Sequence, residues 1–279
     1  MTRLRIGLVQ YDPAFRRHKR NVQHVDAMIA TLQPGDVDIL LLPEMTFTGY
    51  MFSNLEEIEP HLEIKDGASV KWAQQTAAHL RCYTLVGFPE RCIESGKLYN
   101  ALAVVDWHGQ VQSIYRKHFL YETDKTWAAE GDRFVSFRLT LPDSRGSLVV
   151  CPSICMDLNP KDFVAPFHAF EFGNFAKNEN PDLVLCAMNW LVSEPPLDAQ
   201  PAEGMWEEVQ DTISYWATRL QPLMGSNVVF AGCNRIGTEK DITFTGSSCI
   251  MLLGKHPVVI DYAGKSEEKL LVTEIAIKR

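Results

Sequence analysis

The sequence predicts an α/β protein in which buried strands alternate with helices. Short apolar runs, such as residues 37–43 and 181–190, have the length and composition of buried strands. Other stretches, such as residues 18–33, carry apolar residues at helical spacing. Hydrophobic residues make up 46% of the 279 positions, which is enough for a large core. Alternating elements of this kind are typical of layered α/β folds.

The first half of the chain contains strands, helices and a hairpin in a regular order. The helix at 18–33 is indicated by Val22, Val25, Ile29 and Leu32, which recur on one face. A turn at His108–Gly109 divides the hairpin. The expected elements are a strand at 4–11, a helix at 18–33, a strand at 37–43, a helix at 68–81, a strand at 83–91 and a hairpin at 98–118.

The second half repeats this order of elements. We expect a strand at 147–157, a helical stretch at 160–177, a strand at 181–190, a helix at 207–224, strands at 227–237 and 246–254, and edge strands within 257–276. No linker or low-complexity tract separates the halves. The similar order predicts two sheets packed back to back in a single domain, 1–279.

Composition excludes several classes of function. The net charge is −8 and no basic run occurs, so nucleic acid is a poor partner. No apolar stretch reaches the roughly 18 to 20 residues of a membrane helix. The N-terminus reads directly as a strand, without a signal peptide. We therefore expect a soluble, cytoplasmic protein that contacts no membrane.

The cysteine count predicts free thiols. Seven cysteines are an odd number, and the chain lacks an export signal. Cys151 and Cys155 lie four residues apart, which suggests zinc, but no second Cys/His pair has suitable spacing for a four-ligand site. We expect no metal.

Three separated segments each place one reactive side chain at the end of an apolar run. Glu44 follows the run in VDILLLPEMTFTGY (37–50), Lys117 lies in QVQSIYRKHFLYETD (110–124), and Cys155 lies in SLVVCPSICMDLNP (147–160). A carboxylate, an amine and a thiol are together the groups that attack an amide or nitrile through a thioester.

Each of these residues also has a simpler interpretation. Spacing alone leaves Cys155 equally a nucleophile or a buried structural thiol. A solvated role fits Glu44 poorly, because it follows apolar residues and a proline. Lys117 either belongs to a basic exposed strand end or, by strand alternation, shares an inner face with Tyr115 and Phe119. A buried lysine requires an acid partner, such as Glu44.

Several motifs resemble those of the nitrilase, or carbon–nitrogen hydrolase, superfamily. They are LLPEMTFTGY, YRKHFL, ICMD, and NRIG (234–237) followed by FTGSSCI (244–250), and they occur in the family's order along the whole chain. The resemblance implies a four-layer α-β-β-α sandwich, no cofactor, and a possible homodimer. It also implies that Cys155 is the nucleophile, Glu44 the general base and Lys117 the group that stabilises the oxyanion.

Within the superfamily, three segments resemble the fungal protein N-terminal amidases. They are TFTGYMFSNLEEIEPHLE (46–63), KHFLYETDKTW (117–127) and CMDLNPKDF (155–163). No arginine lies between Cys155 and Lys161, which argues against the small-acid amidases. The resemblance implies removal of the side-chain amide from protein or peptide N-termini bearing Asn or Gln, as in the N-degron pathway. A second supporting acid is also implied, and Glu122 is chosen over Asp124 and Glu130.

Specificity requires a carboxylate for the substrate's α-ammonium group. Asp157 and Asp124 are the candidates, although either can instead bond backbone in its turn. Asn189 and Trp190 follow a strand and can form a pocket wall, with core packing as the alternative for Trp190. Tyr50 follows the glutamate loop and can line the entrance.

Other functions compete with N-terminal deamidation. A small-molecule amidase or carbamoylase would use the same three reactive residues. A catalytically silent scaffold on the same fold is a second alternative. A papain-like protease would need His118 or His168 as its base, but the papain sequence context around the cysteine is absent.

Overall fold

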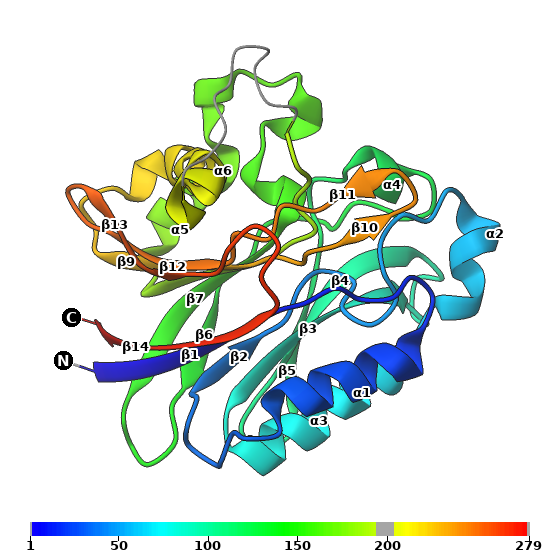
Figure 1. Cartoon of the computed structure of the whole chain (residues 1–279), viewed down its shortest axis with the longest axis horizontal. Helices are drawn as coiled ribbons and strands as arrows, with labels where there is room; N and C mark the ends of the chain where they lie inside the picture. Colours follow the sequence, from blue (N-terminus) through cyan, green and yellow to red (C-terminus); the bar gives the residue numbers. More distant parts are fainter. Residues whose placement is uncertain (1, 194–203, 278–279) are drawn as a thin grey trace.

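Two six-stranded sheets pack face to face between two layers of helices (Figure 1). The computed structural model describes residues 2–193 and 204–277. This arrangement confirms the α-β-β-α sandwich expected from the sequence. No helix within these two ranges has the length and apolar composition needed to cross a bilayer.

The first sheet is built mainly from the N-terminal half of the chain. Its order is β14 (Lys269–Ile277), β1 (Thr2–Gln10), β2 (Ile39–Leu41), β3 (Tyr83–Arg91), β4 (Leu98–Val105) and β5 (Val111–Arg116). Strands β1, β2 and β3 are parallel, and the remaining pairings are antiparallel. Helices α1 (His18–Ile29) and α3 (Ala68–Leu80) cover its outer face, and α2 (Leu55–Ile58) lies beyond the ends of its strands (Figure 1).

The second sheet comes from the C-terminal half. Its order is β13 (Pro257–Tyr262), β12 (Cys249–Leu253), β9 (Val228–Cys233), β8 (Leu183–Ala187), β7 (Ser147–Ile154) and β6 (Phe137–Thr140). Its three central strands, β7, β8 and β9, are parallel. Helices α5 (Glu171–Glu179) and α6 (Met205–Arg219) pack on its outer face. A short separate hairpin consists of β10 (Thr238–Glu239) and β11 (Ile242–Thr243).

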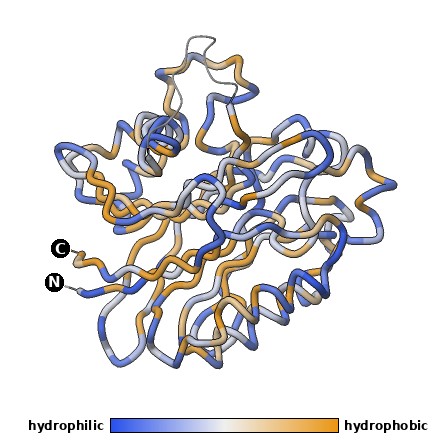
Figure 2. Tube along the Cα trace, viewed as in Figure 1, coloured by the Kyte–Doolittle hydropathy of each residue, from blue (hydrophilic) through white to orange (hydrophobic). Residues whose placement is uncertain are grey.

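The apolar side chains form three layers that hold the sandwich together. One cluster lies between the sheets and includes Leu8, Leu41, Leu148 and Leu185. The others lie beneath α1 and α3 and beneath α5 and α6. Figure 2 shows hydrophobic stretches along the strands, whereas α1 alternates hydrophilic and hydrophobic residues. Each fully buried Leu, Ile or Val contributes roughly 1.5–3 kcal/mol, so burial of these layers is the main stabilising term.

Most of the expected elements are confirmed, and one helix is wrong in extent. The strand at 83–91 and the hairpin at 98–118 form where expected. The helical stretch at 160–177 does not begin at 160, because α5 starts at Glu171 and two 3₁₀ turns precede it. Pro166 lacks an N–H donor, and the left-handed φ of 45° at Phe170 interrupts a helix.

The last strand returns to the first sheet. The expected edge strands are confirmed, but they belong to different sheets: β13 is an edge strand of the second sheet and β14 of the first. Strand β14 pairs with β1 along its whole length, from Thr2 opposite Ile277 to Gln10 opposite Lys269. The two ends of the described chain therefore lie side by side (Figure 1). Because the C-terminal strand completes the N-terminal sheet, we propose that residues 1–279 fold as one domain.

Candidate active site

Lys117 lies between two carboxylates in the interior of the protein. Its Nζ is 2.6 Å from Glu44 Oε1 and 2.6 Å from Asp124 Oδ2, and all three side chains are fully buried. Glu44 follows β2, Lys117 follows β5, and Asp124 lies in the short helix α4 (Glu122–Lys125). The expected acid partner for a buried lysine is thus present twice, which offsets the cost of burying its charge.

Asn100 also joins the two carboxylates. Its Nδ2 donates to Glu44 Oε1 at 2.6 Å and to Asp124 Oδ1 at 2.9 Å. The sequence analysis missed this residue. A signal was available, because Asn100 is a lone amide within the apolar strand LYNALAVV, and a buried amide in such a strand is usually retained for its hydrogen bonds.

Asn189 holds the second oxygen of Glu44. Its backbone N–H donates to Glu44 Oε2 at 2.8 Å, and its Nδ2 donates to the Glu44 backbone carbonyl at 3.1 Å. Its Oδ1 is buried and has no hydrogen-bond partner among the described residues. This oxygen can accept a hydrogen bond from a bound molecule, and the pocket-wall role expected for Asn189 stays a prediction.

The charges in the cluster are set by burial and by one another. Burial raises the pKa of Glu44 to about 6, with the nearby Lys117 ammonium acting in the opposite direction and Asp124 adding to the rise. Burial lowers the pKa of Lys117, but the Asp124 and Glu44 carboxylates outweigh it and hold that pKa above its usual value. Lys117 is therefore a permanent cation, and Glu44 is a base whose pKa suits proton transfer near neutral pH.

Cys155 occupies a distinctive position at the end of β7. It begins a 3₁₀ turn, Cys155–Leu158, with a left-handed φ of 38°. Backbone strain of this kind is often found at functional sites. All seven cysteines are described and free, and six are buried, whereas Cys155 is partly exposed. Cys155 is thus the least buried of the cysteine residues, which favours the nucleophile over the structural interpretation.

Glu44 and Lys117 both act on the Cys155 sulfur. Burial raises the pKa of this thiol well above its usual value; the Glu44 carboxylate raises it further, whereas Lys117 and a hydrogen bond from the Asn189 backbone lower it. The backbone N–H of Asn189 therefore acts on both the Glu44 carboxylate and the Cys155 thiol. Glu44 and Lys117 therefore lie near enough to Cys155 to influence its charge, and the resting form of Cys155 is a thiol.

Asp157 does not have the role expected for it. Its Oδ1 accepts from the N–H groups of His118 and Phe119, and its Oδ2 accepts from Ile154 N–H and the Tyr115 hydroxyl at 2.7–3.1 Å. A fully buried carboxylate with four donors cannot also bind a substrate ammonium group. Asp157 instead ties the cysteine turn to the segment that carries Lys117.

Glu122 and Asp124 do not take the positions expected from the sequence. The side chain of Glu122 is exposed, whereas Asp124 is buried beside Lys117. The two residues lie two positions apart on a single helical turn, so they face different directions. The acid that contacts Lys117 beside Glu44 is therefore Asp124 and not Glu122. Since Asp124 is occupied by Lys117, it is also not the partner expected for the substrate's ammonium group.

The two aromatic candidates make different contacts. Tyr50 is buried, donates its hydroxyl to Asp124 Oδ2 at 3.1 Å, and places its ring 5.4 Å from Lys117 Nζ, so it supports the cluster rather than an entrance. Trp190 is partly buried, its backbone N–H donates to Asn234 Oδ1, and its ring packs on Tyr215 and Trp216. It remains compatible with both of its expected roles.

The backbone that carries Glu44 passes unusually close to β3. A Cβ atom added to Gly87 would lie 2.8 Å from Glu44 Cα and 2.6 Å from Met45 N. Only glycine permits this approach. In the described part of the chain, no group of three or more His, Cys, Asp and Glu side chains is arranged to hold a metal ion.

Comparisons with known proteins agree with this geometry. Residues 5–159 match the family model described as carbon-nitrogen hydrolase. The chain is 35% identical to a protein N-terminal amidase of Schizosaccharomyces pombe, covering 96% of this chain and 98% of the relative. It is 33% identical to a protein N-terminal amidase of Saccharomyces cerevisiae over 81% of this chain, and it spans about half (54%) of that longer relative.

The fold also matches solved structures. A crystal structure of an N-terminal amidase with an Asn-Glu-Ala peptide superposes with a TM-score of 0.84 at 22% identity, covering 99% of both chains. At that identity the match supports the shared sandwich fold.

Proposed function

Because the chain belongs to the carbon–nitrogen hydrolase family, we propose that it removes the side-chain amide from protein or peptide N-termini bearing Asn or Gln. The reaction consumes water, releases ammonia and leaves Asp or Glu at the N-terminus. Cys155 acts as the nucleophile, Glu44 as the general base and acid, and Lys117 as the group that stabilises the oxyanion.

Attack begins with proton transfer from the thiol. Since burial holds the pKa of Cys155 high and that of Glu44 about 6, the ionised carboxylate accepts the proton as sulfur approaches the carbonyl carbon. The carbon–sulfur bond forms, and the carbonyl electron pair moves to oxygen. The Lys117 ammonium, with the backbone N–H after Cys155, stabilises that oxyanion.

Collapse of the tetrahedral intermediate expels ammonia. The carbon–nitrogen bond breaks as protonated Glu44 returns its proton to the leaving nitrogen, and an acyl thioester remains on Cys155. Glu44 then takes a proton from water, whose oxygen attacks the thioester. The free acid leaves and the thiol is restored.

The observation that carries this proposal is the Glu44–Lys117–Asp124 cluster next to the partly exposed Cys155. A base, a permanent cation and a thiol near one another are the reactive groups that the proposed reaction uses. A silent scaffold would not need this combination of buried charges, which is costly to keep without a function.

The substrate class is supported by the relatives. Two curated relatives above 30% identity are named protein N-terminal amidases, and the solved amidase holds a peptide that begins with Asn. The unpaired Oδ1 of Asn189 offers an acceptor for the amide N–H of such a side chain. Deamidation of this kind would place the protein in the N-degron pathway.

Ammonia release separates the candidate functions. Peptides beginning with Asn or Gln are compared with free glutamine and an N-carbamoyl amino acid, and mass spectrometry follows conversion of amide to acid. We expect turnover of the peptides. Turnover of the small molecules alone would establish the small-molecule amidase, and turnover of none would support the scaffold.

Location and assembly complete the proposal. We place the protein in the cytoplasm, where peptide N-termini of this kind arise and where its free thiols would stay reduced. Fluorescent tagging tests the location. A homodimer follows from the family resemblance, and light scattering of the purified chain tests it.

A further inference from the structure

We propose that the buried Arg235–Glu239 ion pair is a positioning device for the Glu44–Lys117–Asp124 cluster and acts through Tyr50. The inference rests on the proposed function, because it assigns a role in the same site. Arg235 follows β9, and Glu239 ends β10, so both come from the second half of the chain. Neither residue touches Cys155, Lys117 or Glu44 through a contact that the structure shows.

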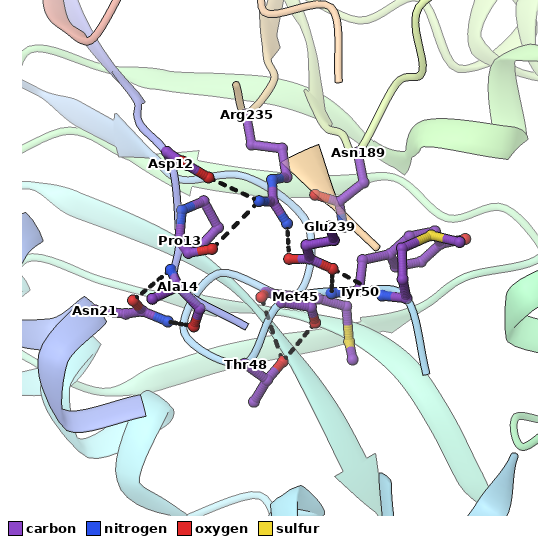
Figure 3. A network of polar contacts seen from close by, with 12 residues as sticks. Asp12, Pro13, Ala14, Asn21, Met45, Thr48, Tyr50, Asn189, Arg235 and Glu239 are labelled. Carbon is purple, nitrogen blue, oxygen red and sulfur yellow. Dashed lines mark hydrogen bonds and ion pairs between the residues drawn. The ribbon is translucent and has the colours of Figure 1, made fainter. Parts of the chain in front are cut away.

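Glu239 holds the loop that follows Glu44. Its Oε2 accepts from two successive backbone N–H groups, those of Tyr50 at 2.8 Å and Met51 at 2.9 Å (Figure 3). Two donors converging on one carboxylate oxygen fix both position and orientation of the loop. The carboxylate is buried, so water does not compete for these bonds.

Arg235 in turn fixes Glu239. The guanidinium is fully buried, pairs with Glu239 Oε1, and reaches Asp12 Oδ1 at 3.1 Å and the Pro13 carbonyl at 3.3 Å (Figure 3). It also lies 4.1 Å from the centre of the Phe244 ring. Asp12 and Pro13 follow β1 of the first sheet, so the pair joins the two halves of the sandwich close to the site.

Two glycines leave room for this contact and for no side chain. A Cβ atom at Gly49 would lie 2.5 Å from Glu239 Oε1, and one at Gly237 would lie 2.0 Å from Asp12 Oδ1. Both residues have a positive φ, of 78° and 89°. The loop that follows Glu44 therefore packs closely against the Arg235–Glu239 ion pair.

Tyr50 connects the loop to the cluster. Glu239 binds its backbone, and its hydroxyl donates to Asp124 Oδ2, the same oxygen that accepts from Lys117 Nζ. Burial raises the pKa of Tyr50, and the neighbouring carboxylates of Asp124 and Glu44 raise it further. The hydroxyl therefore stays protonated, and remains a donor, across the working pH range. The path runs from Arg235 through Glu239 and Tyr50 to Asp124.

A double-mutant cycle separates this role from general stabilisation. The variants are Glu239→Gln, Tyr50→Phe and the double variant, and the readout is the rate of Cys155 alkylation by iodoacetamide between pH 5 and 9, followed by intact mass. Cys155→Ala identifies the modified thiol. This readout needs no amide substrate, so the inference can fail or stand independently of the proposed function.

We expect each single variant to slow alkylation near neutral pH about tenfold, which corresponds to one unit of pKa or 1.36 kcal/mol. The double variant should be no slower than the slower single variant, because both changes break the same path. Multiplying effects, about a hundredfold in the double variant, would overturn the inference, as would a wild-type rate in Glu239→Gln.

Asp38→Asn is the matched control. Asp38 is likewise a buried carboxylate that pairs with an arginine, Arg145, and accepts a backbone N–H, that of Arg5 at 2.8 Å. It precedes β2, whereas Glu44 follows it. This variant should lose thermal stability while keeping the wild-type alkylation profile. If Glu239→Gln does not fold, Glu239→Asp replaces it in the cycle with the same expected outcomes.

Discussion

Asp124→Asn is the change that most sharply separates the observed site from the one expected by sequence. It removes one negative charge next to Lys117 and keeps the shape of the side chain. Asp124 accepts hydrogen bonds from Lys117, Asn100, the Tyr50 hydroxyl and the Tyr121 N–H. The amide that replaces it still accepts at one oxygen but leaves Lys117 paired with Glu44 alone.

The size of the effect follows from the lost charge. A hydrogen bond to a charged group contributes about 1.5–3 kcal/mol, and each 1.36 kcal/mol changes a rate tenfold. If the Asp124–Lys117 contact is needed to place the ammonium group in the transition state, kcat/KM should fall roughly tenfold to a hundredfold.

The pH profile gives a second, signed expectation. Activity requires ionised Glu44, whose pKa is about 6, so the wild-type rate falls as the pH drops through that value. The Asp124 carboxylate raises this pKa and Lys117 lowers it. Removing the Asp124 charge removes one of the influences that raise the pKa of Glu44, while burial still raises it and Lys117 still lowers it, so the acidic limb should move to lower pH.

The assay is ammonia release from an Asn-initiated peptide between pH 4.5 and 8, with Glu122→Gln as control. Glu122 carries the same charge two positions earlier and is exposed, so its variant should keep the wild-type rate and limb. The reasoning is refuted if Glu122→Gln lowers the rate as much as Asp124→Asn, or if the acidic limb of Asp124→Asn stays in place.

Three further changes test neighbouring contacts. Gly87→Ala places a methyl group 2.8 Å from Glu44 Cα. We expect the free energy of unfolding, measured in urea, to fall by about 1–3 kcal/mol and kcat to fall as well. An unchanged kcat would argue against the close approach. Asp157→Asn replaces an acceptor of four hydrogen bonds with a group that is partly a donor. The free energy of unfolding in urea should therefore fall by about 3 kcal/mol. An unchanged free energy of unfolding would contradict the role of Asp157 in tying the cysteine turn to the Lys117 segment. Asn100→Leu removes the amide that joins the two carboxylates, so kcat/KM should fall roughly tenfold, and a wild-type value would show that Lys117 alone organises them.

The fold was largely predictable because its strands are short, apolar and bounded by turn residues. Periodicity identified the strand at 83–91 and the hairpin that follows, since their hydrogen-bond partners are near in sequence. It failed at 160–170, where apolar residues are spaced as in a helix but prolines and left-handed residues form separate turns.

The site was predictable where a motif marks a strand end, and not where side-chain direction decides. Glu44, Lys117 and Cys155 were each expected at the end of an apolar run; the structure pairs Glu44 with Lys117, and both influence the charge of Cys155. Glu122 and Asp124 are both acids in the same short segment, so the sequence does not distinguish them. The orientation of α4 decides that Asp124, and not Glu122, points inward to Lys117. Asn100 meets Glu44 across 56 positions, a contact that depends on the pairing of β3 and β4 in the folded sheet.

The most direct measurement is peptide mapping of the enzyme after acid quenching during turnover of an Asn-initiated peptide. We predict an acyl group on the peptide that contains Cys155, with none in Cys155→Ala, which should release no ammonia. Ammonia release by Cys155→Ala at the wild-type rate, or an acyl group found on another residue, would contradict the thioester chemistry assigned to this site.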